Sequence, residues 1–172
     1  MVELETAVEA DYPDIIALTN RAFRDTSSEG SWNVEDMIEG ERVNESLLRD
    51  DVATPGAHLL IWRDADGKHL GHVRLDAAHD GIWFLGLLTV RPDRQASGLG
   101  RKLLAASEAW ARERGARGMR MTVVHQRETL IAWYVRRGYV VTGEIKPFPY
   151  DDPRFGRPTR PDLYFDVLEK AL

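Results

Sequence analysis

The sequence contains no cysteine, and this absence removes two classes of structure at once. Neither a disulfide framework nor a zinc–thiolate site can be built from these 172 residues. Because nothing in the composition points to an oxidising compartment, we expect a cytoplasmic protein.

Long apolar runs are also missing. No stretch approaches the roughly 18 apolar residues that a membrane span needs, and the first ten residues lack the basic region of a secretory signal peptide. The sequence therefore predicts no membrane association. With 43% hydrophobic and 30% charged residues, the composition is near the globular average, and the length suits one domain with a buried core. We expect a single domain over residues 1–172.

The chain has no basic excess, since its net charge is −5. This acidic balance argues against nucleic acid as a partner. The charge is uneven, because residues 1–51 carry 14 acidic and 4 basic side chains whereas residues 52–172 carry 14 acidic and 19 basic ones. Two interpretations stay open: an ordinary solvated surface, or a field that draws an anionic cofactor to the second part and a cationic amine to the first.

Hydrophobic spacing predicts a chain of strands and helices. Residues 82–90, IWFLGLLTV, form the longest apolar run and are typical of a central strand covered on both faces. The strand, helix and strand between 82 and 125 predict a parallel pair, so we expect an α/β fold with a mixed sheet and helices on both faces. The expected strands are 1–6, 58–63, 68–77, 82–90, 119–125, 139–145 and 163–168, and the expected helices are 11–24, 33–49, 98–114 and 128–137.

A glycine-containing segment, VRPDRQASGLG at 90–100, separates the central strand from the next helix. Gly98 and Gly100 lack a Cβ, so the backbone can direct its N–H groups to one point at a helix N-terminus, where the macrodipole favours an anion. Four basic residues and one aspartate between 91 and 102 suit a ligand with several phosphates. Two glycines are also typical of a plain helix start. Neither the P-loop nor the GxGxxG pattern fits, because Arg101 follows Gly100 and Leu103 replaces the third glycine.

The pattern Q-x-x-G-x-G after Val-x-Pro resembles the acyl-CoA loop of the GNAT superfamily of N-acetyltransferases, and LIAWYVRRGY at 130–139 resembles that family's second signature. The order of elements follows the family over essentially the full length. The resemblance implies a GNAT-like fold: a mixed seven-stranded sheet flanked by about four helices, with a splayed pair of parallel strands at the acyl-CoA site. It also implies acetyl-CoA as donor and a primary amine as acceptor. The stretches AFRDTSSEGSW and PFPYDDPRFGRP are similar to a subgroup of uncharacterised GNAT-like proteins.

The same resemblance implies cofactor-binding positions. Leu88 and Val90 would offer backbone groups to pantetheine, and Arg94 or Arg101 would touch a phosphate. Arg127 stands where the family usually has asparagine, which puts one cofactor contact in question, although an arginine suits the adenosine 3′-phosphate. The amides expected to take the pyrophosphate belong to Gln95, Ala96, Ser97, Gly98, Leu99 and Gly100.

Tyr134 occupies the position of the family's catalytic tyrosine. Its phenol is protonated at neutral pH and would donate a proton to the departing CoA thiolate. From spacing alone, Tyr134 is also typical of a core tyrosine one turn from Leu130. No acidic residue or histidine lies in 82–90, so the position of the glutamate base in some relatives is empty. His125 could act as base directly or through water, or it could be a structural histidine.

The acceptor is less well defined. Trp32 could line a pocket for an amine's carbon chain or cap a helix, and Glu35, Glu39 and Glu41 on the predicted second helix could form a pocket wall or plain surface. These residues favour a small cationic molecule or a peptide as acceptor. The proline-rich connection at 147–161 is expected to cover the pocket or to form a homodimer over it.

Two further expectations concern a non-catalytic function and metal dependence. A non-catalytic acyl-CoA sensor or partner-binding module on the same fold stays open, favoured by the missing base and disfavoured by Tyr134. We expect no metal dependence, because His69 and His72 on a strand should point to opposite faces and could not easily share one ion.

Overall fold

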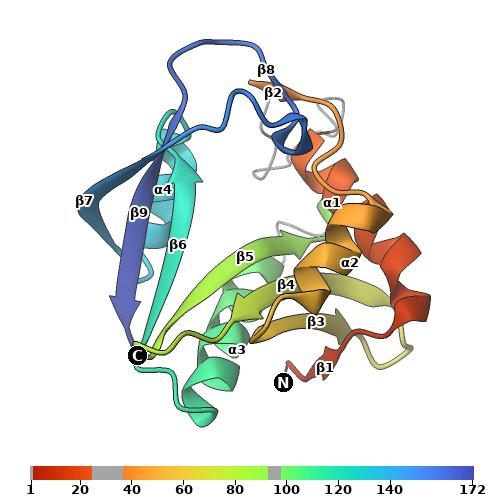
Figure 1. Ribbon diagram of the computed structural model, residues 1–172. Coiled ribbons are helices and arrows are strands. Elements are labelled where there is room, and N and C mark those ends of the chain that lie inside the picture. Colours follow the sequence, from red (N-terminus) through yellow and green to blue (C-terminus); the bar gives the residue numbers. More distant parts are fainter. Residues whose placement is uncertain (1, 25–36, 93–97) are drawn as a thin grey trace.

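The computed structural model describes residues 2–24, 37–92 and 98–172 (Figure 1). Among these residues, no helix is long and apolar enough to cross a membrane. The helices are α1 (Tyr12–Arg24), α2 (Glu45–Ala53), α3 (Leu99–Glu113) and α4 (Glu128–Val135). The strands are β1 (Leu4–Thr6), β2 (Ile38–Glu39), β3 (Ala57–Arg63), β4 (His69–Asp76), β5 (Ile82–Val90), β6 (Gly118–Val124), β7 (Val140–Pro147), β8 (Arg157–Pro158) and β9 (Tyr164–Ala171).

Seven strands form one mixed sheet in the order β1-β3-β4-β5-β6-β9-β7, and β2 and β8 form a separate two-stranded sheet. Each neighbouring pair in the large sheet is antiparallel except β5 and β6, which are parallel. The α3 helix makes the crossover between those two strands, as the strand, helix and strand pattern predicts. The predicted mixed sheet is confirmed.

The helices cover both faces of the sheet because alternate residues of each strand point in opposite directions. Leu59 and Ile61 of β3 pack against Ile15 of α1 and Leu48 of α2. The neighbouring Leu60 belongs instead to the core cluster on the α3 and α4 side. Full burial of a side chain such as Leu48 or Leu60, both 0% exposed, stabilises the fold by about 2 kcal/mol.

The second predicted helix, 33–49, is wrong in its first part. Ile38–Glu39 is a strand that pairs with Arg157–Pro158, far along the sequence, and the helix starts only at Glu45. The Asn44 side chain caps it by accepting a hydrogen bond from the Leu47 N–H at 2.9 Å. Apolar residues at 37, 38 and 43 imitate helical spacing, but pairing between distant segments decides the local structure. Residues 33–36 lie outside the described part of the chain.

The two parallel strands, β5 and β6, diverge from each other toward their C-terminal ends (Figure 1). The β5 and β6 ladder includes only the pairs from Ile82–Phe84 to Gly118–Arg120. Beyond Phe84, Leu87 and Leu88 oppose the single residue Val73 of β4, which is a β-bulge. Leu87 has a φ of 52°, the only positive φ of a non-glycine residue in the described ranges. The predicted splayed strands are therefore confirmed.

The expectation that His69 and His72 point to opposite faces is wrong. Nε2 of His69 lies 3.0 Å from Nδ1 of His72, and Nε2 of His72 lies 2.7 Å from Oγ1 of Thr19. The register between β3 and β4 shifts where His69 pairs, and this irregularity breaks the alternation. Burial lowers the pKa of His72 well below its ordinary value. The described residues contain no group of three or more side chains that could hold a metal ion.

Candidate active site

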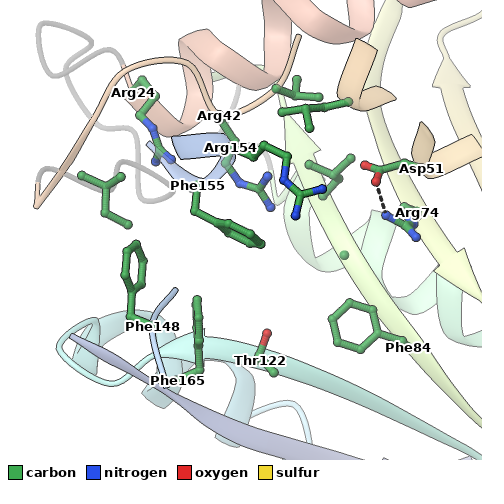
Figure 2. Close-up of a pocket in the computed structure, with 15 residues that line it drawn as sticks. Arg24, Arg42, Asp51, Arg74, Phe84, Thr122, Phe148, Arg154, Phe155 and Phe165 are labelled. Carbon is green, nitrogen blue, oxygen red and sulfur yellow. Dashed lines mark ion pairs between the residues drawn. The ribbon is translucent and has the colours of Figure 1, made fainter. Parts of the chain in front are cut away.

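Two cavities occupy the opening between β5 and β6. The strand gap, about 120 Å³, runs between the two strands toward α4. The arginine–phenylalanine cavity, about 310 Å³, lies on the side of α1, α2 and the connection between β7 and β9 (Figure 2). The two cavities share lining residues, so they meet at the bulge of β5. The shared residues are Arg42, Phe84, Gly86, Leu87 and Thr122.

Tyr134 lines the strand gap from α4, together with Leu88 and Arg127. Its ring packs edge-on against Trp133 and Tyr139, with centroid distances of 5.0 and 5.6 Å. Burial raises the pKa of the Tyr134 phenol well above its ordinary value, and the nearby Arg127 charge opposes this only in part. The phenol is therefore protonated at neutral pH and can act as a proton donor inside the gap.

The N-terminus of α3 follows directly on the glycine-containing segment. Gly98 caps this helix with a φ of 73°, in the left-handed region that glycine adopts without strain. A Cβ at Gly98 would lie 3.8 Å from Nη2 of Arg101, so a guanidinium lies beside the helix end, where N–H groups and the macrodipole already favour an anion. Leu99 and Gly100 are buried in the first turn.

The other predicted cofactor positions are distributed as follows. Leu88 lines the strand gap, whereas Val90, fully buried, pairs with Gly71 at the end of β5 and is not among the gap's lining residues. Gln95, Ala96 and Ser97, together with Arg94, lie outside the described residues.

His125, the predicted base, lies just after β6. Its Nδ1 is 2.7 Å from Oδ2 of Asp166 on β9, and its ring stacks on Tyr164 with a centroid distance of 4.4 Å. The side chain is 46% exposed and belongs to neither set of cavity-lining residues. A histidine held by a carboxylate in this way has a fixed orientation.

The arginine–phenylalanine cavity combines charge and aromatic surface that the sequence did not predict. Figure 2 shows the guanidinium groups of Arg24, Arg42 and Arg154 along one side, and the rings of Phe148 and Phe165 along the other. These residues come from α1, the segment before α2, the proline-rich connection and β9, so no sequence motif links them. The remaining charged and aromatic lining residues are Asp51, Arg74, Phe84 and Phe155.

Asp51, on α2, is the one carboxylate among the described residues that line this cavity. Its Oδ1 is 2.8 Å from Nη1 of Arg74, whose Nε is 2.9 Å from Asp76. Burial raises the pKa of Asp51, while Arg74 and Arg42 oppose that shift. Asp51 and the strained Leu87 line one small neighbouring cavity, so this carboxylate lies close to the point where the two larger cavities meet.

Glu39 and Glu41, for which a pocket wall and plain surface were both left open, are surface residues. Glu39 belongs to β2 and Glu41 to the turn after it, both are exposed, and neither lines the cavity. Trp32 and Glu35 lie outside the described residues. The wall that the structure describes is rich in arginine, because the start of the predicted helix is a strand and loop that turn Arg42 inward (Figure 2).

Comparisons with known proteins agree with this geometry. The model of the acetyltransferase (GNAT) family matches residues 13–139. The mycothiol acetyltransferases of Clavibacter sepedonicus and Stackebrandtia nassauensis are 32% and 30% identical over 140 and 135 residues, which cover 80% and 75% of this chain. The chain spans only 42% and 41% of the length of these relatives.

Similar solved structures share the arrangement of elements. A structure described as a putative phosphinothricin N-acetyltransferase has a TM-score of 0.72 at 14% identity, covering 100% of this chain and 99% of its own. Spermidine N-acetyltransferase from Vibrio cholerae, in complex with CoA and spermine, has a TM-score of 0.70 at 14% identity, covering 99% and 95%. A putative streptothricin acetyltransferase from Bacillus anthracis, in complex with acetyl coenzyme A, has a TM-score of 0.57 at 16% identity, covering 75% and 70%. Identities this low show the fold alone.

Proposed function

The chain belongs to the acetyltransferase (GNAT) family, and on that premise we propose that it transfers an acetyl group from acetyl-CoA directly to a primary amine of a small molecule. One observation carries the proposal: the strand gap that holds Tyr134 opens, at the Leu87 bulge, into a second cavity of about 310 Å³. That volume is in the range of small-molecule sites. Peptide amines stay within the proposal, because the cavity opens to solvent.

The residues of the strand gap fit the donor. The ladder between β5 and β6 stops at Phe84, so an extended chain with amide groups can lie where a strand would continue. Leu88 and Val123 give the gap an apolar lining, and Gly98 and Arg101 at the start of α3 suit phosphate groups. When bound, acetyl-CoA supplies an acetyl group activated as a thioester. Pyrophosphate binding by residues 95–97 and contacts from Val90 remain proposals of the same kind.

Two side chains carry the proton transfers in this proposal. Asp51 accepts the proton that the ammonium must lose before its nitrogen attacks, because it is the carboxylate beside the meeting point of the cavities. Its raised pKa makes it a better proton acceptor than an exposed aspartate. The N–C bond forms, and Tyr134 donates a proton to the departing sulfur as the C–S bond breaks. The nitrogen of the adduct then releases its second proton to solvent, and the Tyr134 phenol regains a proton from solvent. His125, acting through water, is the alternative base.

The assembly and location also remain proposals. All eight residues of β7, the last strand of the sheet, are exposed, and Val140 and Ile145 are 64% and 60% exposed. We expect a second copy of the chain to cover this edge in a homodimer, since open apolar edge strands tend to associate. A monomeric mass in solution would contradict this expectation. Cell fractionation tests the predicted cytoplasmic location.

The experiment that tests the proposed function measures thiol release from acetyl-CoA with a panel of amines and identifies the acetylated product by mass spectrometry. The panel includes spermidine and phosphinothricin, which relatives' names mention. Asp51→Asn should lower the rate strongly, whereas Asp50→Asn is the matched control: it removes the exposed neighbouring carboxylate of α2, which does not line the cavity. No amine-dependent release, with acetyl-CoA still raising the Tm, would favour a non-catalytic acyl-CoA sensor.

A further inference from the structure

Among the described residues that line the arginine–phenylalanine cavity, guanidinium groups outnumber carboxylates. Its described lining includes four guanidinium groups, of Arg24, Arg42, Arg74 and Arg154, against the single carboxylate of Asp51. The four arginines come from four separate parts of the fold, so their convergence is a property of the tertiary structure. Guanidinium groups that converge on one cavity can donate together to one anionic group, as arginines do when they bind a carboxylate or a phosphate.

Aspartates outside the cavity hold two of these arginines in place. Asp76 accepts from Nε of Arg74 at 2.9 Å. Asp152 binds Nε of Arg154 at 2.9 Å and Nη2 at 2.5 Å. A guanidinium has five N–H donors in a planar fork, so a carboxylate that engages one edge fixes the direction of the other. This support from behind is the arrangement expected where an arginine binds an oxyanion in front.

The opposite wall is aromatic. Phe148 is 5% exposed and stacks on Phe165 with a centroid distance of 5.7 Å. Phe84 and Phe155 also line the cavity. Such a wall buries apolar carbon, and the aromatic rings offer no hydrogen-bond acceptor to a chain of ammonium groups. A ligand of the whole cavity therefore needs an apolar part as well as an anionic one.

The carboxylate, the arginines and the aromatic wall each suit a different part of one bound acceptor molecule. Resting on the proposed function, we infer that the acceptor is an amine that also carries an oxyanion, a carboxylate or phosphonate, and an apolar side chain, as an α-amino acid does. The amine lies at Asp51, the oxyanion at Arg42 and Arg154, and the apolar part on Phe148. This reverses the preference for a cationic acceptor that residues 35–45 suggested, because a polyamine would face four arginines.

Matched amines test the inference. We would measure kcat/KM for L-phenylalanine, L-leucine and L-methionine, each beside its decarboxylated amine, and for an aminophosphonate analogue and spermidine. In each pair only the oxyanion differs. We expect kcat/KM for at least one amine that carries the oxyanion to exceed that for its decarboxylated partner and for spermidine by about tenfold or more, the effect of one charge-assisted hydrogen bond. Equal or faster turnover of all decarboxylated partners or of spermidine would overturn the inference and leave the proposed function intact.

Variants show whether the arginines cause the preference. Arg42→Met and Arg154→Met should each reduce, by about tenfold, the ratio of kcat/KM for the carboxylated amine to kcat/KM for its decarboxylated partner. Arg157→Met is the control, because Arg157 lies on the neighbouring β8, is 77% exposed and does not line the cavity. Equal losses for both members of a pair would indicate a structural role and would count against anion recognition.

A binding measurement separates this inference from the proposed function. Calorimetry with CoA present would compare N-acetyl-L-phenylalanine with its decarboxylated counterpart, N-acetyl-2-phenylethylamine. Tighter binding of the carboxylate by about tenfold, lost in Arg42→Met, supports the anion site even if no amine is turned over. Equal affinity of the two ligands refutes the site even if amines are acetylated.

Discussion

Two neighbouring tyrosines should separate catalysis from stability. Tyr134 and Tyr139 pack edge-on with a centroid distance of 5.6 Å, and both are buried, at 5% and 1% exposed. Only their hydroxyl environments differ. The Tyr139 hydroxyl donates a 2.8 Å hydrogen bond to Oε2 of Glu108, whereas none of the described groups hydrogen-bonds the Tyr134 hydroxyl, which lies along the strand gap. Replacing either residue with phenylalanine keeps the ring and removes one hydroxyl.

The expected magnitudes follow from these contacts. Tyr134→Phe removes the proton donor to the departing thiolate, and general acid catalysis contributes about 100-fold to 10,000-fold. We therefore expect kcat to fall at least about 100-fold, or about 2.7 kcal/mol of barrier. With no described bond broken, the free energy of unfolding should change by less than about 1 kcal/mol.

Tyr139→Phe should give the opposite pattern. It removes a hydrogen bond to a buried carboxylate, which costs about 1.5–3 kcal/mol and lowers the Tm by roughly 3–12 °C for a chain of this size. The loss stays below that of a fully unpaired buried charge, because Nζ of Lys170 still donates to Glu108 at 3.0 Å. We expect kcat of this variant to stay within about threefold of the wild type.

The assay pairs steady-state thiol release with thermal and urea unfolding of the wild type and both variants. A Tyr134→Phe protein that keeps more than about one third of the wild-type kcat would refute the donor role and leave the sulfur to be protonated by water. A Tyr139→Phe protein that loses kcat without losing stability would show that the two hydroxyls have been assigned wrongly.

Three other predictions follow from single contacts. Asp51→Asn should remove the acidic limb of the pH–rate profile, because the deprotonated carboxylate is the active form and burial raises its pKa; an unchanged limb would point to another base. Gly156→Ala would place a Cβ 2.6 Å from the Glu39 carbonyl oxygen at a φ of 85°, so the pairing of β2 with β8 should weaken. We therefore expect the KM of the amine to rise while the KM of acetyl-CoA does not change. Equal changes in both KM values would argue against a local effect. The free energy of unfolding should fall below about pH 6.5, by up to about 1.4 kcal/mol per pH unit for buried His72, because the unfolded chain binds a proton that the folded chain excludes. His72→Gln should flatten this dependence measured in urea, and His79→Gln, at an exposed position, should not.

Local sequence determines much of the sheet. Residues 82–90 form a strand with the predicted bounds, because a continuous apolar run can be satisfied only at the centre of a covered sheet. The helix and strand that follow, α3 and β6, were predictable from their own hydrophobic spacing. Gly98 marks the start of α3, because glycine adopts the left-handed cap conformation without strain. The second helix was not predictable, since β2 forms only by pairing with β8, more than one hundred residues further along the chain.

Some residues of the candidate site could also be predicted from the sequence, and others could not. Tyr134 and residues 90–100 were predicted for the donor side, because each belongs to a motif contained in one short stretch of the sequence. Asp51, Arg42 and Arg154 were not identifiable, because each is an ordinary surface-type residue in its own segment and gains its position only when α2, the loop before it and the proline-rich connection come together. The sequence alone thus predicted the residues of the proposed donor side. Only the tertiary structure decided the charge of the acceptor cavity, because electrostatic interactions act between atoms that are close in space, whatever their separation along the chain.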